Sequence, residues 1–113
     1  MLRIRKKQMD VFQAIAEADF RLRLEEHLRE LFPRLGDFEL SESVDRVFAV
    51  ASEYSITRES DVVRLAKLQI EHWEMAGEGE IPPQAARILA FRQVKASERL
   101  ERLQEWLEVE AGR

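Results

Sequence analysis

Apolar residues recur every three or four positions along the first thirty-odd residues, which is the spacing of one face of a helix. No Gly or Pro interrupts this pattern before Pro33, so the sequence predicts one helix from about Arg5 to about Phe32. At 1.5 Å per residue that helix is roughly 40 Å long, against roughly 35 Å for the diameter of a compact chain of this size. We therefore expect this helix to reach the edge of its own core or to extend beyond it. The apolar positions are Ile4, Met9, Phe12, Ala16, Phe20, Leu24, Leu28, Leu31 and Phe32.

The composition favours a helical domain over a disordered chain. The 113 residues include 35% charged residues but only 4 Gly and 3 Pro. A chain of this length can bury a core of its own. We expect an all-α fold: a single-domain bundle of about five helices over residues 1–113, with a long N-terminal helix.

Start and stop residues divide the rest of the chain into four shorter helices. Ser and Thr are good N-cap residues, and Pro fits the first helical position. The segment Gly77–Glu80 should be a flexible break. The expected limits are Ser41 or Ser43 to Tyr54 for the second helix, Thr57 as the start of the third, Pro83 to Phe91 for the fourth, and Ser97 as the start of the fifth.

Each of these helices carries an apolar face that should form the core. The third has the widest face, which is typical of a central helix contacted from two sides. The faces consist of Val44, Val47, Phe48 and Ala51; Val62, Leu65, Ala66, Leu68, Ile70 and Trp73; Ala85, Ile88, Leu89 and Phe91; and Leu100, Leu103, Trp106 and Leu107.

No pattern in the sequence predicts an active site, a metal site or a cofactor. The two histidines each follow a glutamate, as Glu26-His27 and Glu71-His72. Adjacent helical residues point about 100° apart, whereas metal ligands on a helix must share a face. The chain has no Cys, so it has no thiol nucleophile. We expect a protein that is not an enzyme, with His27 beside the first apolar face and His72 solvated.

The turn between the second and third helices has the length found in a helix-turn-helix. The third helix, however, would open with Arg58, Glu59 and Asp61, and two acids at that position repel phosphate. The net charge of −4 also opposes general nucleic-acid binding. We expect no nucleic-acid partner.

The sequence also predicts no membrane association. No apolar stretch approaches the roughly 20 residues that cross a bilayer. The basic N-terminal segment is not followed by the continuous apolar run of a signal peptide. We expect a cytoplasmic protein.

The N-terminal end of the first helix is the predicted partner-binding site. Residues 1–35 carry 8 basic and 6 acidic side chains, whereas residues 36–113 carry 10 and 16. Four shorter helices should cover the middle of the long apolar face more easily than both its ends. A homodimer would satisfy this geometry as well as a toxin or chaperone would. The predicted apolar contacts are Ile4, Met9 and Phe12, with Arg5, Lys6 and Lys7 as a polar rim.

Four blocks of sequence follow one another in a recognisable order. They are Ile4-Arg5, Gln8 and Phe12; Phe20, His27-Leu28-Arg29 and Phe32-Pro33; Tyr54-Ser55-Ile56-Thr57 and Asp61-Val62; and Ala86-Arg87-Ile88-Leu89, Ser97-Glu98-Arg99-Leu100 and Leu103. In this order they resemble a family of small helical accessory proteins, of co-adaptor or co-chaperone type, encoded beside spike and toxin genes in bacterial type VI secretion clusters. The chain departs from that family at Ser55, where Gly is usual, and after Pro83, where no Trp follows.

The resemblance implies an accessory role: helping an adaptor chaperone load a toxin onto the secretion spike. It implies no catalytic residues. The rival hypothesis is an immunity protein that neutralises a toxin by occluding its active site. The acidic body of the chain would suit the basic cleft of a nuclease. The sequence leaves both roles open.

Overall fold

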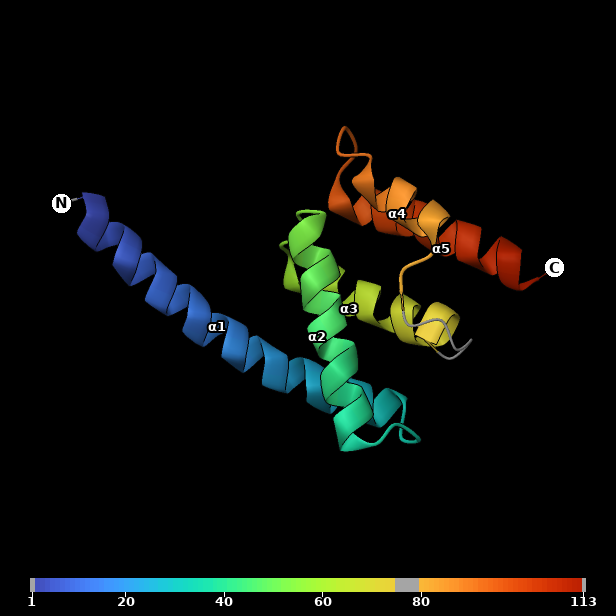
Figure 1. Ribbon diagram of the computed structural model, residues 1–113, viewed down its shortest axis with the longest axis horizontal. Coiled ribbons are helices and arrows are strands. Elements are labelled where there is room, and N and C mark those ends of the chain that lie inside the picture. Colours follow the sequence, from blue (N-terminus) through green and yellow to red (C-terminus); the bar gives the residue numbers. More distant parts are fainter. Residues whose placement is uncertain (1, 75–79, 113) are drawn as a thin grey trace. The chain divides into compact units, whose positions relative to one another are not determined.

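The structure, a computed structural model, describes the backbone of residues 2–74 and 80–112 and the side chains of residues 17–73 and 80–112. Within this part the chain forms five α-helices and one π-helical segment, with no strand, which confirms the all-α prediction (Figure 1). The elements are α1 (Leu2–Leu31), α2 (Asp37–Glu53), α3 (Glu59–Leu68), η1 (Gln69–Glu74), α4 (Pro83–Ala90) and α5 (Ala96–Ala111).

The chain groups into two compact units, residues 1–41 and residues 42–113. We call them the N-terminal unit and the C-terminal unit. The first consists of α1, the following turn and the start of α2. The second holds the rest of α2 and all later elements. A single domain over 1–113 stays a prediction.

Helix α1 buries the middle of its predicted apolar face. Phe20, Leu24 and Leu28 are spaced by four residues and are at most 8% exposed. The helix ends at Leu31, one residue before the predicted end, and Leu31 itself is 46% exposed. The predicted positions up to Ala16 lie outside the described side chains, so the long apolar face stays a prediction over that half.

Helix α2 begins at Asp37, which corrects the prediction that Ser41 or Ser43 caps it. The first helical hydrogen bond runs from the Leu40 amide to the Gly36 carbonyl, at 2.9 Å. Acidic residues occupy the first turn, where they interact favourably with the helix dipole. The serine hydroxyls are therefore not needed as caps. Ser43 is instead buried within the helix.

The C-terminal end of α2 is a Schellman motif. The Ile56 amide donates to the Ala51 carbonyl at 2.8 Å, and the Ser55 amide donates to the Ser52 carbonyl at 3.4 Å. Ser55 has φ of 57°, in the left-handed region that this motif requires. Ile56 and Ala51 are both buried, as the apolar contact of the motif demands.

We predict that Ser55→Gly stabilises the protein. An L-residue in the left-handed region costs roughly 1–2 kcal/mol, and the larger unfolded-state entropy of Gly offsets about 0.5–1 kcal/mol of that gain. The free energy of unfolding should rise by about 0.5–1 kcal/mol, measured by urea denaturation. Ser52→Gly is the control, because it lies within α2 and should lower stability by about 0.5 kcal/mol. Equal losses in both variants would contradict the assignment.

Two further predicted caps are wrong by one or two residues. The N-cap of α3 is Arg58, not Thr57, and that of α5 is Lys95, not Ser97. Neither cap residue makes a side-chain capping hydrogen bond. The backbone carbonyls of both cap residues still accept the first helical bond, from Val62 and Arg99. Both helices therefore begin where the extended backbone turns into the helix, and not at a residue whose hydroxyl could cap it.

The third predicted helix is regular only as far as Leu68 and then continues as the π-helical η1. Gln69, at the start of η1, is 1% exposed, and its Nε2 donates to the Ser43 carbonyl at 3.1 Å. Ile70 and Trp73 are buried as predicted. The sequence pattern indicated the buried apolar residues but not the change of helix type.

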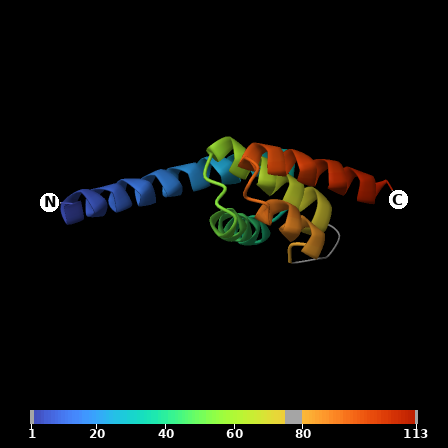
Figure 2. The same ribbon diagram turned by 90° about the horizontal axis from the view of Figure 1, so that it is seen from above.

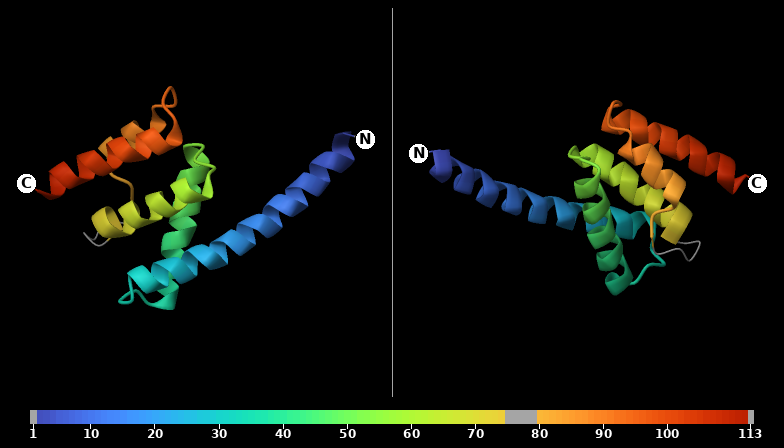
Figure 3. Two further views of the ribbon diagram at one scale, coloured as in Figure 1. Left: turned by 180° about the vertical axis from the view of Figure 1, so that it is seen from behind. Right: turned by 45° about the horizontal axis from the view of Figure 1, so that its top comes forward.

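The C-terminal unit forms a core from most of the predicted faces, whereas Phe48, Ile88 and Trp106 of those faces are only half-buried. Helix α5 contacts both α3 and α4, and Figures 2 and 3 show these helices side by side. Pro83 occupies the start of α4 as predicted. Phe91 is a correction: it lies beyond α4 and is 49% exposed, because the helix ends at Ala90. The buried apolar side chains of this unit are Val44, Val47, Ala51, Ile56, Val62, Leu65, Ala66, Leu68, Ile70, Trp73, Ala85, Leu89, Leu100, Leu103 and Leu107.

Candidate functional surfaces

The partner-binding site predicted from the sequence lies outside the described side chains. Its six residues all precede Glu17, where side-chain description begins. This site therefore stays a prediction. The residues concerned are Ile4, Arg5, Lys6, Lys7, Met9 and Phe12.

The turn between α1 and α2 and the helix ends beside it carry four apolar side chains that are exposed or half-buried, which we call the turn patch: Leu31, Phe32, Leu35 and Phe38. Phe38 is 76% exposed and Leu31 is 46% exposed. Phe32 and Leu35 are half-buried. All four fall within eight consecutive residues of the N-terminal unit, and the helical spacing of the sequence includes only Leu31 and Phe32, on the α1 face. Large apolar side chains gathered in this way mark a candidate contact surface.

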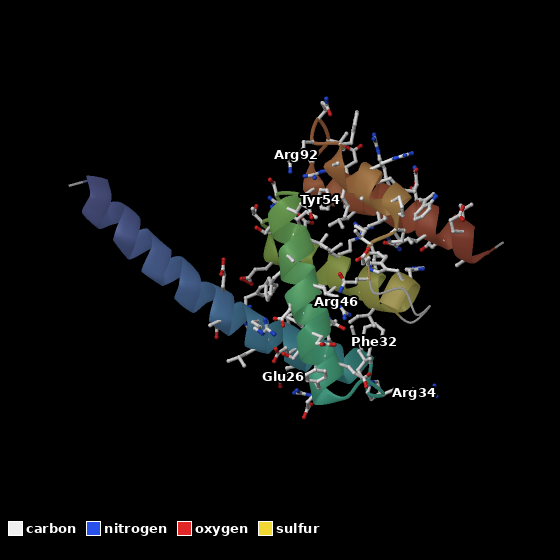
Figure 4. All side chains as sticks on the ribbon, in the orientation of Figure 1. Glu26, Phe32, Arg34, Arg46, Tyr54 and Arg92 are labelled. Atoms are coloured by element: carbon white, nitrogen blue, oxygen red, sulfur yellow. The ribbon has the colours of Figure 1, made fainter. Side chains whose placement is uncertain are left out.

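Hydrogen bonds within the N-terminal unit hold this turn in place. The Leu35 amide donates to the Phe32 carbonyl at 3.1 Å, and Arg29 Nη2 lies 3.2 Å from Asp37 Oδ1. Arg21 further binds both the carbonyl and the hydroxyl of Ser41, at 3.2 and 3.1 Å. Figure 4 labels Phe32 and Arg34 at the turn. The Arg29–Asp37 pair is exposed and should contribute at most about 1 kcal/mol, so the backbone sets the shape of the turn.

The C-terminal unit holds a buried arginine that the sequence analysis did not identify. Arg99 is only 5% exposed. Its Nε donates to the Val94 carbonyl at 3.0 Å, and its Nη1 donates to the carbonyls of Tyr54, at 2.9 Å, and of Leu89. One guanidinium therefore satisfies carbonyls at the C-terminal ends of both α2 and α4, which have no partner within their helices. The signal in the sequence was its position four residues before Leu103, on the apolar face of α5.

A second arginine reaches the same end of α2. Arg92 Nη2 donates to the Glu53 carbonyl, one residue before the carbonyl that Arg99 binds. Tyr54 lies beside Arg92 in Figure 4. Burial, and then the Glu53 carboxylate, raise the pKa of the Tyr54 phenol, whereas the Arg92 charge lowers it.

The described residues contain no group of three or more His, Asp and Glu side chains able to hold a metal ion. His27 is half-buried beside the α1 face, as expected. His72 is also half-buried rather than fully solvated. No helix in the described part of the chain is both long and apolar enough to span a bilayer.

No known family model, curated protein or solved structure matches this chain.

Proposed function

We propose that this protein is a non-catalytic protein-binding module, an accessory co-adaptor that assists the loading of a toxin onto a type VI secretion spike in the cytoplasm. The resemblance of its four sequence blocks supports the secretion role. The exposed turn patch supports protein binding, and Phe38 at 76% exposure is the single observation that carries it. The partner would be an adaptor chaperone or the toxin itself.

Isolated exposed apolar residues are normal on a protein surface and need no partner. The turn patch differs because four large apolar side chains fall within eight consecutive positions. Charged side chains surround them in sequence: Arg29, Glu30, Arg34, Asp37 and Glu39 are all exposed. An apolar centre with a charged rim is the usual composition of a protein–protein interface.

A second function, immunity to a toxin, is favoured by the charge of α5. Four glutamates at spacings of three and four residues, Glu98, Glu101, Glu105 and Glu108, are exposed along this helix. Residues three and four apart share a helix face, so these carboxylates form a ridge. Such a ridge would complement the basic cleft of a nuclease toxin.

We predict that Phe38→Asp weakens binding to the partner at least tenfold, because a carboxylate would replace the most exposed aromatic ring of the turn patch. The assay is co-expression with each product of the neighbouring genes, followed by calorimetry on the purified pair. Leu22→Asp is the matched control, since Leu22 is 67% exposed but lies outside the patch. Circular dichroism should show the same helicity in both variants.

The same assay decides between the two predicted surfaces. The double substitution of Met9 and Phe12 by Asp tests the N-terminal end of α1. If the double variant loses partner binding and the Phe38→Asp variant binds as tightly as the wild type, the contact lies in the N-terminal segment. If no neighbouring product binds and scattering shows a homodimer that these substitutions dissociate, the surface joins two copies of the chain. Inhibition of a toxin's activity by the purified protein would favour immunity over loading.

A further inference from the structure

The C-terminal end of α2 carries more positive charge than its helix dipole neutralises. Arg92 and Arg99, which we call the arginine pair, bind the consecutive carbonyls of Glu53 and Tyr54. Arg99 also binds the end of α4 through Leu89. Each helix C-terminus is equivalent to roughly half a negative charge. Two helix ends thus offset about one of the two guanidinium charges.

The pair also has hydrogen-bond donors to spare. The described contacts of Arg99 use its Nε and Nη1, and its Nη2 has no acceptor in the described part of the chain. No buried side-chain nitrogen among the described residues lacks a partner, so this Nη2 group reaches solvent. Arg92 is exposed and uses only one Nη2 bond. Arg99, which is only 5% exposed, therefore keeps one nitrogen without a protein acceptor, and Arg92 binds the carbonyl next to the one that Arg99 binds.

No carboxylate of the described residues forms an ion pair with either arginine. Glu53, whose backbone carbonyl Arg92 binds, carries a carboxylate of its own. Its side chain is exposed and makes no ion pair with Arg92. The remaining charge is thus free to take an anion from outside the chain, and guanidinium groups match the planar shape of a carboxylate.

The neighbouring residue indicates which anion fits. Phe91, next to Arg92, is 49% exposed at the end of α4. An exposed apolar residue that directly precedes Arg92 in the sequence suits a carboxylate that is carried on a polypeptide rather than a small inorganic ion. We propose that the arginine pair binds a Glu or Asp side chain of an acidic segment in a partner protein, with Phe91 as the adjoining apolar contact.

This inference rests on the proposed protein-binding function, because it assigns the carboxylate to a partner protein. The site can still be tested without the natural partner. The probe is a blocked peptide of sequence Leu-Glu-Glu-Leu, compared with its Leu-Gln-Gln-Leu analogue and with inorganic phosphate. Each is titrated into the full chain, labelled with nitrogen-15, and followed by NMR at the Arg92 Nε–H and the amides of residues 91–95.

We expect saturable shifts with the glutamate peptide and none with the glutamine analogue. Arg92→Gln should lower the affinity for the glutamate peptide at least tenfold, since it removes one of the two guanidinium groups. Arg87→Gln, an exposed arginine of α4 outside the pair, is the matched control and should leave binding unchanged. It removes the same charge, so the comparison separates a specific site from general attraction.

Equal weakening in both variants, a response to the glutamine analogue, or binding of phosphate without the glutamate peptide would each overturn the proposal. The proposed function is tested separately, by the co-expression assay. If a neighbouring product binds the wild-type chain and the peptide gives no saturable shifts, the function stands and this inference fails. If the peptide binds as expected while no neighbouring product does, the site stands as a carboxylate site and the loading role fails.

Discussion

Arg99→Met should lower the free energy of unfolding by about 3–4 kcal/mol, because it leaves three carbonyls that Arg99 now binds without their donor. Hydrogen bonds to a charged group contribute about 1.5–3 kcal/mol each, and Met keeps much of the buried apolar stem, which limits the packing loss. For a chain of this size the melting temperature should fall on the order of 15 °C. Calorimetry and urea denaturation measure both quantities.

Arg102→Met is the control for this prediction. Arg102 lies on the same helix and is exposed. Its replacement by Met removes the same charge as the replacement of Arg99. Its substitution should change stability by at most about 0.5 kcal/mol. Similar small losses in both variants would show that water replaces the guanidinium at the helix ends without cost.

Leu65→Ala should destabilise the protein by about 3–4 kcal/mol, because the substitution removes buried methyl groups and leaves a cavity. Leu65 is 0% exposed in α3. Helix α3 contacts α5, so the cavity would open in the core of the C-terminal unit. Urea denaturation should show a lower midpoint with an unchanged slope.

The same substitution at an exposed site provides the control. Leu22 is 67% exposed, and Leu22→Ala should change the free energy of unfolding by less than about 1 kcal/mol. A loss at Leu22 as large as that at Leu65 would mean that Leu22 is covered in solution, for example by a second copy of the chain.

Helical periodicity predicted most of the core, because burial of an apolar face is the largest stabilising term and repeats every three to four residues. It failed where an element ends. Phe91 shares the spacing of the α4 face but lies beyond the helix, and is exposed. The predicted N-caps were wrong because residue type alone does not fix where a helix begins. Ser41, Thr57 and Ser97 are suitable cap residues, yet the backbone enters the helix at other positions.

The candidate surfaces were less predictable than the core. Leu35 and Phe38 belong to no apolar repeat, so only the three-dimensional turn identifies them as exposed. Arg99 occupies a position on the apolar face of α5, but charged residues are rarely buried without a partner. Its partners are backbone carbonyls 5, 10 and 45 residues away. Every residue has a backbone carbonyl, so the residue types in the sequence do not indicate these partners.

The guanidinium of Arg99 links the fraying of two helices. It holds the Tyr54 carbonyl at the end of α2 and the Leu89 carbonyl at the end of α4 with the same nitrogen. A motion that withdraws this side chain releases both ends together, so the two helix ends share one opening equilibrium instead of unravelling separately. Local unfolding at either helix end would then affect the other, 35 positions away in the sequence, through one side chain.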